Sequence, residues 1–312
     1  MALRREALAT PDGDELLLDH ADGPFDGPAA GPRLLVLHGL EGSSNSVYVQ
    51  GLLEAGGRAG FRGVALNFRS CARDPADLAR MLPNRRPRLY HSGETEDLDF
   101  VARTLVARET GVPLVVVGVS LGGNVLLKWL GEQGERAPVA AAAALSTPYD
   151  LAASARHLGS AVGRIYVARF LATLKAKARS VAERFPETAA RVDLERALAA
   201  RDFREFDDAA TAPLHGFAGA EDYYARSSSL GFLPRIAKPT LCLSALDDPF
   251  LPGETPPRAR AAASTAIEFR TTPQGGHIGW VSGPWPWRPR YWAEELAIDW
   301  LAAALPAIDS SG

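Results

Sequence analysis

A serine flanked by glycines follows an apolar run near the middle of the chain. Residues 118–122 read GVSLG and come directly after the continuous apolar run 114–117 and before a stretch with helical spacing. Small residues around the serine let the backbone turn sharply from strand to helix, which lifts the hydroxyl above the sheet. We interpret Ser120 as a nucleophile. The alternative is a glycine-rich turn that serves only the close packing of helix on sheet.

A serine hydroxyl is a weak nucleophile near neutral pH and needs a base to take its proton. In proteins that place the serine on such a turn, an acid and then a histidine follow it along the chain. The other five histidines lie before Ser120 or in a segment predicted to be helical: His20, His38, His91, His157 and His215. His277 alone follows the last predicted strand, between glycines that let its loop reach over the sheet. We predict His277 as the base; the alternative is a buried structural histidine.

Two adjacent carboxylates lie between the serine and the histidine, at the end of a predicted strand. The acid of such a site accepts a hydrogen bond from the imidazole and stabilises the imidazolium that forms. Asp248 lies three residues after Ala245 and four before Pro252, a spacing shared by many hydrolases with this turn. The spacing favours Asp248. Asp247 remains the second candidate, with loop ordering or helix capping as its other role.

Backbone N–H groups are the expected donors to the oxyanion that develops on an attacked carbonyl. Leu121 follows the serine at the start of a helix, where the helix dipole also favours negative charge. Leu40, after His38 and Gly39, is the expected second donor. His38 is then predicted to hold that loop in place.

Short apolar runs alternate with helical segments along the chain. This alternation predicts the fold that positions the candidate site residues. Continuous runs bounded by glycine, proline or asparagine are typical of strands buried on both faces. An antiparallel edge hairpin is expected over residues 3–20, around the turn 11–13. The further predicted strands are 34–37, 64–66, 114–119, 140–145, 240–243 and 267–269, and the predicted helices include 96–108, 124–134 and 291–304. This order predicts an α/β fold with a mostly parallel sheet of about eight strands and helices on both faces.

The segment 150–230 contains no convincing strand and shows Ala, Arg, Leu and Glu at helical spacing. We predict a helical cap inserted after the sixth strand of a single domain spanning residues 1–312, above the carboxyl ends of the strands. Four apolar positions of the cap are expected to be buried against the mouth above Ser120: Ile165, Phe170, Leu171 and Leu174. Its basic residues predict a solvated helix face, with anionic lipid as the alternative: Arg164, Arg169, Lys175, Lys177, Arg179 and Arg184.

The charge balance, the cysteine count and the N-terminal segment exclude several classes of protein. The 312 residues carry 34 Lys+Arg against 37 Asp+Glu, so the net charge of −3 gives no reason to expect nucleic acid as a partner. Two cysteines, Cys71 and Cys242, exclude a disulfide framework and a cysteine-built zinc site, and favour a reducing compartment. The N-terminus lacks the apolar segment of a signal peptide. We expect a cytoplasmic monomer without stable membrane insertion.

Weaker patterns leave alternatives open. The acidic residues 94–99 beside His91 indicate the first turn of a helix, with a metal site as the less favoured hypothesis. Cys71 is expected to have a buried apolar role. Four tryptophans after His277 are predicted either to line an acyl pocket or to pack against the last helix: Trp280, Trp285, Trp287 and Trp292.

Several segments together resemble one branch of a known family. They are LHGLEGSSNSVYVQGL (37–52), LNFRSC (66–71), LYHSGETEDL (89–98), VVGVSLGGNVLLKWLGE (116–132), ALDDPF (245–250) and GGHIGW (275–280). The chain thereby resembles the YheT-like branch of the α/β-hydrolase fold, which groups bacterial YheT hydrolases with eukaryotic lipase-like proteins of hydrolase-domain type 4. The resemblance implies a triad of Ser120, Asp248 and His277, a helical cap and carboxylesterase or lipase activity. One departure is Ser70, where the family more often has glycine.

The predicted function is that of a serine hydrolase that cleaves small-molecule or lipid acyl esters through an acyl-enzyme, with no metal or organic cofactor. An acyltransferase or a thioesterase would use the same triad and remains an alternative. A non-catalytic lipid-binding module on the same scaffold is a further alternative, disfavoured by the three triad positions and their glycines. A dehalogenase or epoxide hydrolase is disfavoured because it would have aspartate at position 120.

Overall fold

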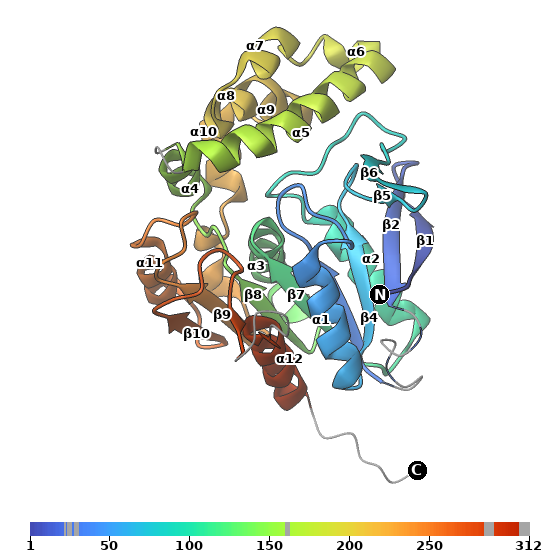
Figure 1. Cartoon of the computed structure of the whole chain (residues 1–312), viewed down its shortest axis with the longest axis vertical. Coiled ribbons are helices and arrows are strands. Elements are labelled where there is room, and N and C mark those ends of the chain that lie inside the picture. Colours follow the sequence, from blue (N-terminus) through green and yellow to red (C-terminus); the bar gives the residue numbers. More distant parts are fainter. Residues whose placement is uncertain (22, 24–26, 28–30, 160–162, 284–289, 306–312) are drawn as a thin grey trace.

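An eight-stranded sheet forms the centre of the molecule in the computed structural model, which describes residues 1–21, 23, 27, 31–159, 163–283 and 290–305 (Figure 1). The strand order is β1-β2-β4-β3-β7-β8-β9-β10. The strands are β1 (Leu3–Ala9), β2 (Glu15–Ala21), β3 (Arg33–Leu37), β4 (Arg62–Asn67), β7 (Leu114–Val119), β8 (Ala141–Leu145), β9 (Thr240–Ala245) and β10 (Ile267–Thr272). From β4 to β10 all neighbours are parallel, whereas β2 is antiparallel to both of its neighbours. The predicted mostly parallel sheet is confirmed.

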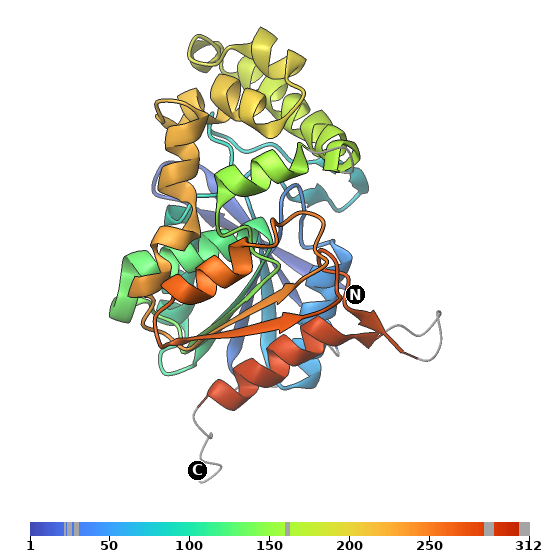
Figure 2. The same cartoon turned by 90° about the vertical axis from the view of Figure 1, so that its left-hand side faces the viewer.

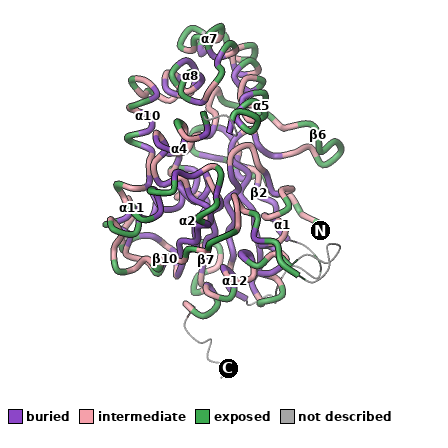
Figure 3. The backbone as a smooth tube through the Cα atoms, turned by 60° about the vertical axis from the view of Figure 1, so that its left-hand side comes forward, coloured by how far each residue is buried: buried purple, intermediate pink, exposed green. Residues whose placement is uncertain are grey.

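The burial of the strands explains their sequences. Every residue of β4, β7, β8 and β9 is buried, because helices cover both faces of the sheet and no alternation with polar residues is needed (Figure 3). Strand β1 lies at the edge and is mostly exposed or half-buried. It joins β2 through a turn in which Gly13 has φ of 78°, so the predicted edge hairpin is confirmed.

Two groups of helices pack on the two faces of the sheet. The helices α1 (Val47–Arg58) and α12 (Trp292–Ala304) share one apolar core with the sheet, and α2 (Glu96–Arg108) and α3 (Leu121–Gln133) share the other. Figure 2 shows α12 and α11 (Thr255–Ala262) on opposite sides of the sheet. Minor elements are η2 (Gly134–Arg136) and the small hairpins β5 (Arg73–Asp74) with β6 (Asp77–Met81) and β11 (Val281–Ser282) with β12 (Arg290–Tyr291).

Helix α1 was not predicted, because three glycines among its 12 residues lower its helix propensity. Packing explains one of them. A Cβ on Gly56 would lie 2.5 Å from Leu34 Cδ2, so glycine lets the helix approach the sheet closely. Helix α11 was also missed, since it begins Thr-Pro-Pro and carries few apolar side chains.

The segment between β8 and β9 consists of helices joined by short turns and loops, with no strand among its described residues, and it lies above the carboxyl ends of the strands (Figure 1). Its elements are α4 (Leu151–Leu158), α5 (Gly163–Arg184), α6 (Pro186–Ala189), α7 (Leu194–Ala199), α8 (Phe203–Phe206), the π-helical turn η3 (Asp207–Thr211), α9 (Ala212–His215), α10 (Ala220–Ser227), η4 (Ser229–Gly231) and η5 (Leu233–Arg235). None of the helices in the described ranges combines the length and apolarity needed to cross a bilayer.

Two expectations about this helical segment are wrong. Ile165 is 77% exposed, because it lies on the outer side of α5 and not toward the body of the protein. Lys177 is not part of a solvated face, since it is buried in an ion pair with Glu41. The other basic residues of the run are exposed or half-buried, as predicted.

Candidate active site

Ser120 lies at the junction of β7 and α3, on a backbone that few side chains adopt. Its φ of 54° and ψ of −118° fall in a sparsely populated region, and its N–H donates to the carbonyl of Leu145 at 2.8 Å. The flanking glycines are required by close approach: a Cβ on Gly118 would lie 2.4 Å from the Gly122 carbonyl, and one on Gly122 would lie 2.6 Å from the carbonyl of His38. The turn therefore presents the serine hydroxyl above the sheet, as the sequence pattern predicts.

His277 reaches Ser120 from the loop after β10. Its Nε2 lies 2.8 Å from Ser120 Oγ, although 157 residues separate the two along the chain. The loop bends back through Gly276 and Ile278, whose φ values are 54° and 63°. Asp247 orders this loop by accepting a hydrogen bond from the Gly276 N–H at 2.8 Å.

Of the two candidate carboxylates, Asp248 contacts the histidine. Its Oδ2 and Oδ1 lie 2.9 and 3.1 Å from His277 Nδ1, and its side chain is only 1% exposed. Asp248 also accepts from the N–H of Phe250, whose ring stacks on the imidazole with centroids 4.3 Å apart. Because Nδ1 faces a carboxylate and Nε2 faces a hydroxyl, we assign the proton to Nδ1, so that Nε2 accepts from Ser120.

The loop after β3 is fixed by side chains of the body. His38 Nε2 accepts from the Phe68 N–H at 3.0 Å, and its Nδ1 donates to the Gly39 carbonyl at 2.7 Å, so the prediction that His38 holds this loop is confirmed. Burial lowers the pKa of His38 to about 4, which keeps the ring neutral. The Gly39 N–H donates to the hydroxyl of Tyr48 at 2.8 Å. These bonds place Leu40 beside the serine.

A cavity of about 320 Å³ opens over these residues, between the sheet and the helical segment 150–230. Ser120, His277, Leu40 and Leu121 all line it. Its apolar wall includes Leu151, Leu158, Phe170, Leu174, Phe203 and Phe250. Phe170 and Leu174 thus line the mouth as predicted, whereas Leu171 is buried in the core of the helical segment.

One side of the cavity carries a carboxylate. Asp207 accepts hydrogen bonds from Thr211 Oγ1 at 2.6 Å and from the Tyr224 hydroxyl at 2.8 Å. Burial raises its pKa to about 6. A side chain that accepts hydrogen bonds therefore faces any molecule bound in this cavity.

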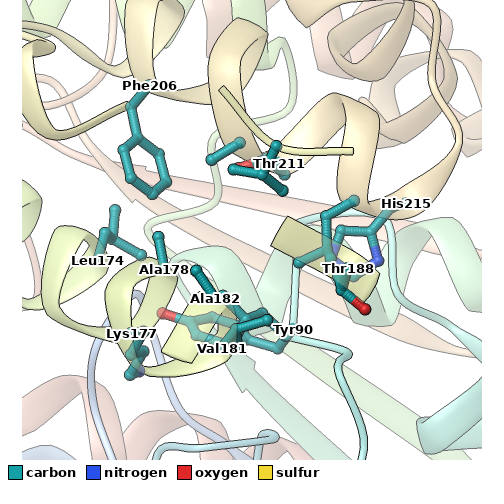
Figure 4. Close-up of a pocket in the computed structure, with 14 residues that line it drawn as sticks. Tyr90, Leu174, Lys177, Ala178, Val181, Ala182, Thr188, Phe206, Thr211 and His215 are labelled. Atoms are coloured by element: carbon teal, nitrogen blue, oxygen red, sulfur yellow. The ribbon is translucent and has the colours of Figure 1, made fainter. Parts of the chain in front are cut away.

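A second, smaller cavity of about 30 Å³ adjoins the first, and Figure 4 shows the residues that line it. Tyr90, Leu174 and Thr211 line both cavities. Its other labelled lining residues come mainly from the helical segment and include Ala178, Val181 and Phe206. Leu174 therefore lies where the two spaces meet.

The acidic residues 94–99 take part in ion pairs, and the tryptophans after His277 that the structure describes do not line the cavity. Asp97 pairs with Arg69 at 2.7 Å and Glu94 with Arg88 at 2.5 Å, and no group of three potential metal ligands occurs in the described ranges. Trp280 is buried in the core beside α12 and does not line the cavity. Trp285 and Trp287 lie outside the described residues, and Trp292 is 37% exposed.

Several residues that shape the site have functions that the sequence alone did not indicate. Glu41, Tyr48, Tyr90 and Phe250 fix or flank the loops that carry the candidate residues. All four lie inside the segments that carry the family resemblance, which was the available signal. Lys177 gave no signal for its contact, because Glu41 lies 136 residues away. Asp207 gave none either, although Thr211, one of its partners, is only four residues away.

Known proteins with similar sequences and structures support the fold described above. Residues 32–284 match the family described as the alpha/beta hydrolase fold. The eight-stranded sheet with a serine and histidine in contact at its carboxyl edge defines an α/β-hydrolase, and the chain belongs to that family. Within the family, the chain is a YheT-like member of the esterase and lipase type.

The relatives that support this assignment align with most of the chain. The Escherichia coli (strain K12) protein named "Putative esterase YheT" is 39% identical over 302 residues, which are 97% of this chain and 85% of that protein. Phospholipase ABHD3 of Mus musculus is 31% identical over 288 residues, 91% of this chain and 67% of that protein. The solved structure of Pyrococcus furiosus esterase PF2001 superposes with a TM-score of 0.56 at 16% identity, covering 88% and 83% of the two chains, which supports the fold alone.

Proposed function

We propose that this protein hydrolyses carboxylic acyl esters as a serine esterase, with Ser120, His277 and Asp248 as its catalytic triad. The observation that carries the proposal is the continuous contact from Ser120 Oγ to His277 Nε2 at 2.8 Å and from His277 Nδ1 to Asp248 Oδ2 at 2.9 Å. A serine, a base within hydrogen-bond reach and a carboxylate that orients the base form the arrangement that activates a hydroxyl for acyl transfer. The names of the esterase and lipase relatives support the same reaction class.

In the first half of the reaction, Ser120 Oγ bonds to the ester carbonyl carbon while its proton moves to His277 Nε2. The carbonyl oxygen becomes an oxyanion that accepts from the N–H groups of Leu40 and Leu121, both of which line the cavity. When this intermediate collapses, the bond to the alcohol breaks and His277 returns the proton to the leaving oxygen. Proton transfer by such a histidine contributes roughly 10²–10⁴-fold to the rate.

In the second half, a water molecule attacks the acyl-enzyme and gives its proton to His277 Nε2. The oxyanion forms again between the same two N–H groups and collapses, which breaks the bond to Ser120 Oγ. The proton on His277 returns to Ser120, and the carboxylic acid leaves. Asp248 stabilises the imidazolium in both halves.

We further propose that the segment 150–230 acts as a cap that excludes water and holds the acyl chain. Phe170, Leu174 and Phe203 supply an apolar wall for that chain, and they come from the segment itself. The two cysteines are unpaired and buried, which supports a reducing compartment, so we propose a small-molecule or lipid ester substrate met in the cytoplasm by a monomer.

The test is a panel of p-nitrophenyl esters of increasing chain length, measured with the wild type and with Ser120→Ala. We expect the substitution to lower kcat by several orders of magnitude without changing the melting temperature, because no other group can form the acyl-enzyme. A variant that keeps more than about a tenth of the wild-type rate would contradict the serine mechanism.

A further inference from the structure

A buried lysine of the cap reaches into the body of the protein. Lys177, in the middle of α5, has a side chain only 5% exposed, and its Nζ donates to Glu41 Oε1 at 2.7 Å and to Cys71 Sγ at 3.1 Å. The ammonium also lies 4.9 Å from the centre of the Tyr90 ring, at the side of the smaller cavity (Figure 4). A single cationic group of the cap thus binds three residues of the body.

Its partner, Glu41, belongs to the loop that carries the proposed oxyanion donor. Glu41 directly follows Leu40, and its φ of 56° lies in the left-handed region that favours glycine. Its backbone N–H donates to the Tyr90 hydroxyl at 2.8 Å, and that hydroxyl donates to Glu41 Oε1 at 2.7 Å. The unfavourable backbone conformation of Glu41 is therefore held by its own side chain and that of Tyr90, and Lys177 completes this set of bonds.

Leu40 lies between two anchored residues. The N–H of Gly39 is held by Tyr48 and the N–H of Glu41 by Tyr90, each at 2.8 Å. The N–H of Leu40 itself donates to no protein acceptor within the described ranges. The bonds on either side of Leu40 thus set the direction of a donor that is free to bind an oxyanion.

We propose that Lys177 and Glu41 are positioning residues, which hold the Leu40 N–H in its productive orientation while the cap is docked. This inference rests on the proposed esterase function. Both side chains are almost fully buried, so removing either charge leaves the other uncompensated beside the loop. The loop would then relax from its strained conformation, and the donor would turn away from the oxyanion. Docking of the cap and formation of the oxyanion site would consequently depend on the same ion pair.

The charge states of Lys177 and Glu41 are consistent with their proposed positioning role. Burial opposes the charge on Glu41, yet the neighbouring Lys177 lowers the pKa of Glu41 overall, so the carboxylate stays charged at neutral pH. Burial raises the pKa of the Cys71 thiol to about 11, so this sulfur contacts Lys177 as a neutral thiol and leaves its positive charge for Glu41.

The test compares Lys177→Met and Glu41→Gln with wild type, at a temperature well below the melting transition of each variant. A misplaced oxyanion donor affects the transition state more than the bound ester, so we expect kcat to fall about 10–100-fold while KM changes less than about threefold. Affinity for an alkyl boronic acid, which forms a tetrahedral adduct with the serine, should fall in parallel with kcat. Because both side chains act through one contact, the double variant should lose little more than either single variant.

Two control variants separate positioning from general stability. Glu109→Gln breaks ion pairs with Arg33 and Arg62 at the other end of the sheet, and Arg179→Met alters an exposed residue of α5 itself. Both should retain wild-type kcat. If Lys177→Met does not fold, Glu41→Gln decides the question, since glutamine keeps an acceptor for the hydroxyl of Tyr90.

The proposal is overturned if folded Lys177→Met or Glu41→Gln keeps kcat and boronic acid affinity within about twofold of wild type, or if the losses are additive. Failure of the underlying function has a different signature. In that case Ser120→Ala would remain active, whereas failure of the positioning role alone leaves a Ser120-dependent esterase that is indifferent to the ion pair.

Discussion

At the scale of single residues, the site depends on backbone conformations that side chains rarely adopt. Ser120, Ile278 and Glu41 all have φ between 54° and 63°, and each lies in a loop that lines the cavity. Such strain persists only where surrounding contacts enforce it, and it concentrates at functional sites. Ser70 has φ of 60°, which explains why the resembling family more often has glycine there. Its hydroxyl bonds to Asn84, so the serine is held by a local contact away from the triad.

The two adjacent aspartates should differ sharply in their effect on catalysis. Asp248→Asn removes the charge that orients His277, and we expect kcat to fall by about 10⁴-fold, as for the corresponding change in a serine protease. Asp247→Asn should cost less than about tenfold, because the amide oxygen can still accept from the Gly276 N–H. Steady-state kinetics on a short-chain ester measures both. The opposite order of effects would assign the catalytic acid to Asp247.

Asp207 should make the stability of the protein depend on pH. Burial raises its pKa in the folded state to about 6 from the usual 3.8, so ionisation is harder in the folded protein than in the unfolded chain. The cost is absent at pH below about 4 and is fully present above about 6. Relative to wild type, Asp207→Asn should therefore gain about 1–3 kcal/mol in unfolding free energy between pH 4 and pH 8. Urea unfolding across this range measures the difference, and a constant offset would contradict the assignment.

At the scale of elements, α5 has three different sides. Ile165 faces solvent, Leu171 packs inside the helical segment 150–230, and Phe170 and Leu174 face the cavity. The 3.6-residue period of a helix distributes neighbouring apolar residues in this way, so apolar character alone does not show which of them meets a substrate. We therefore expect only the side of α5 that carries Phe170 and Leu174 to influence which substrate is preferred.

Leu174→Ala and Phe170→Ala should change which acyl chain is preferred. Removing Leu174 would connect the two cavities, so we expect the profile of kcat/KM to shift toward longer chains. One methylene in an apolar pocket is worth about 1–3 kcal/mol, which corresponds to roughly 10–200-fold in the ratio between neighbouring substrates. The p-nitrophenyl ester series measures the profile.

Leu171→Ala is the matched control for these variants. It removes a similar volume from the same helix, but the side chain is buried within the cap core and does not line either cavity. It should lower the melting temperature and leave the chain-length profile unchanged. If Leu174→Ala and Phe170→Ala also lower stability with a flat profile, the cap only packs against the body and substrate selection lies elsewhere.

At the scale of the whole molecule, the end of the sheet at the carboxyl ends of the strands differs in role from the opposite end. The carboxyl ends of the strands carry Ser120, the loop of Leu40 and the cap, where strained loops surround a cavity. At the opposite end, Glu109 binds Arg33 at 2.7 Å and Arg62 at 2.8 Å, so that the end of α2 is tied to the first residues of β3 and β4. Ion pairs therefore connect elements at one end of the sheet, and the proposed reaction takes place at the other end.

Glu109→Gln should lower stability in a pH-dependent manner. Hydrogen bonds from Arg33, followed by those from Arg62, lower the pKa of Glu109 to about 2 from its usual 4.5. A carboxylate with a lowered folded-state pKa stabilises the protein above its unfolded-state pKa and loses that effect as the pH falls toward 2. We expect a loss of about 1–2 kcal/mol at pH 7 that shrinks as the pH falls below 4.5 and disappears below about pH 2, measured by denaturant unfolding. An equal loss at pH 7 and pH 3 would show that packing dominates.

The sequence by itself determined the sheet, the turn and the chain order of the candidate residues. Continuous apolar runs are enough to recognise strands buried on both faces. In the GVSLG turn, Gly118 is required by its close approach to Gly122 within the turn, whereas Gly122 is required by its contact with the His38 carbonyl. Helices α1 and α11 escaped prediction because glycines and prolines weaken the periodic signal on which such predictions depend.

Only the tertiary structure decided which side chains meet. Asp247 and Asp248 are neighbours in the chain, and the fold of the His277 loop brings one to the imidazole and the other to a backbone N–H. Lys177 and Glu41 lie 136 residues apart, so no local pattern could pair them. Local sequence sets the backbone conformation through short-range steric effects. Contacts between side chains that are distant in the sequence depend on how the segments pack together, and this packing is determined by the whole chain.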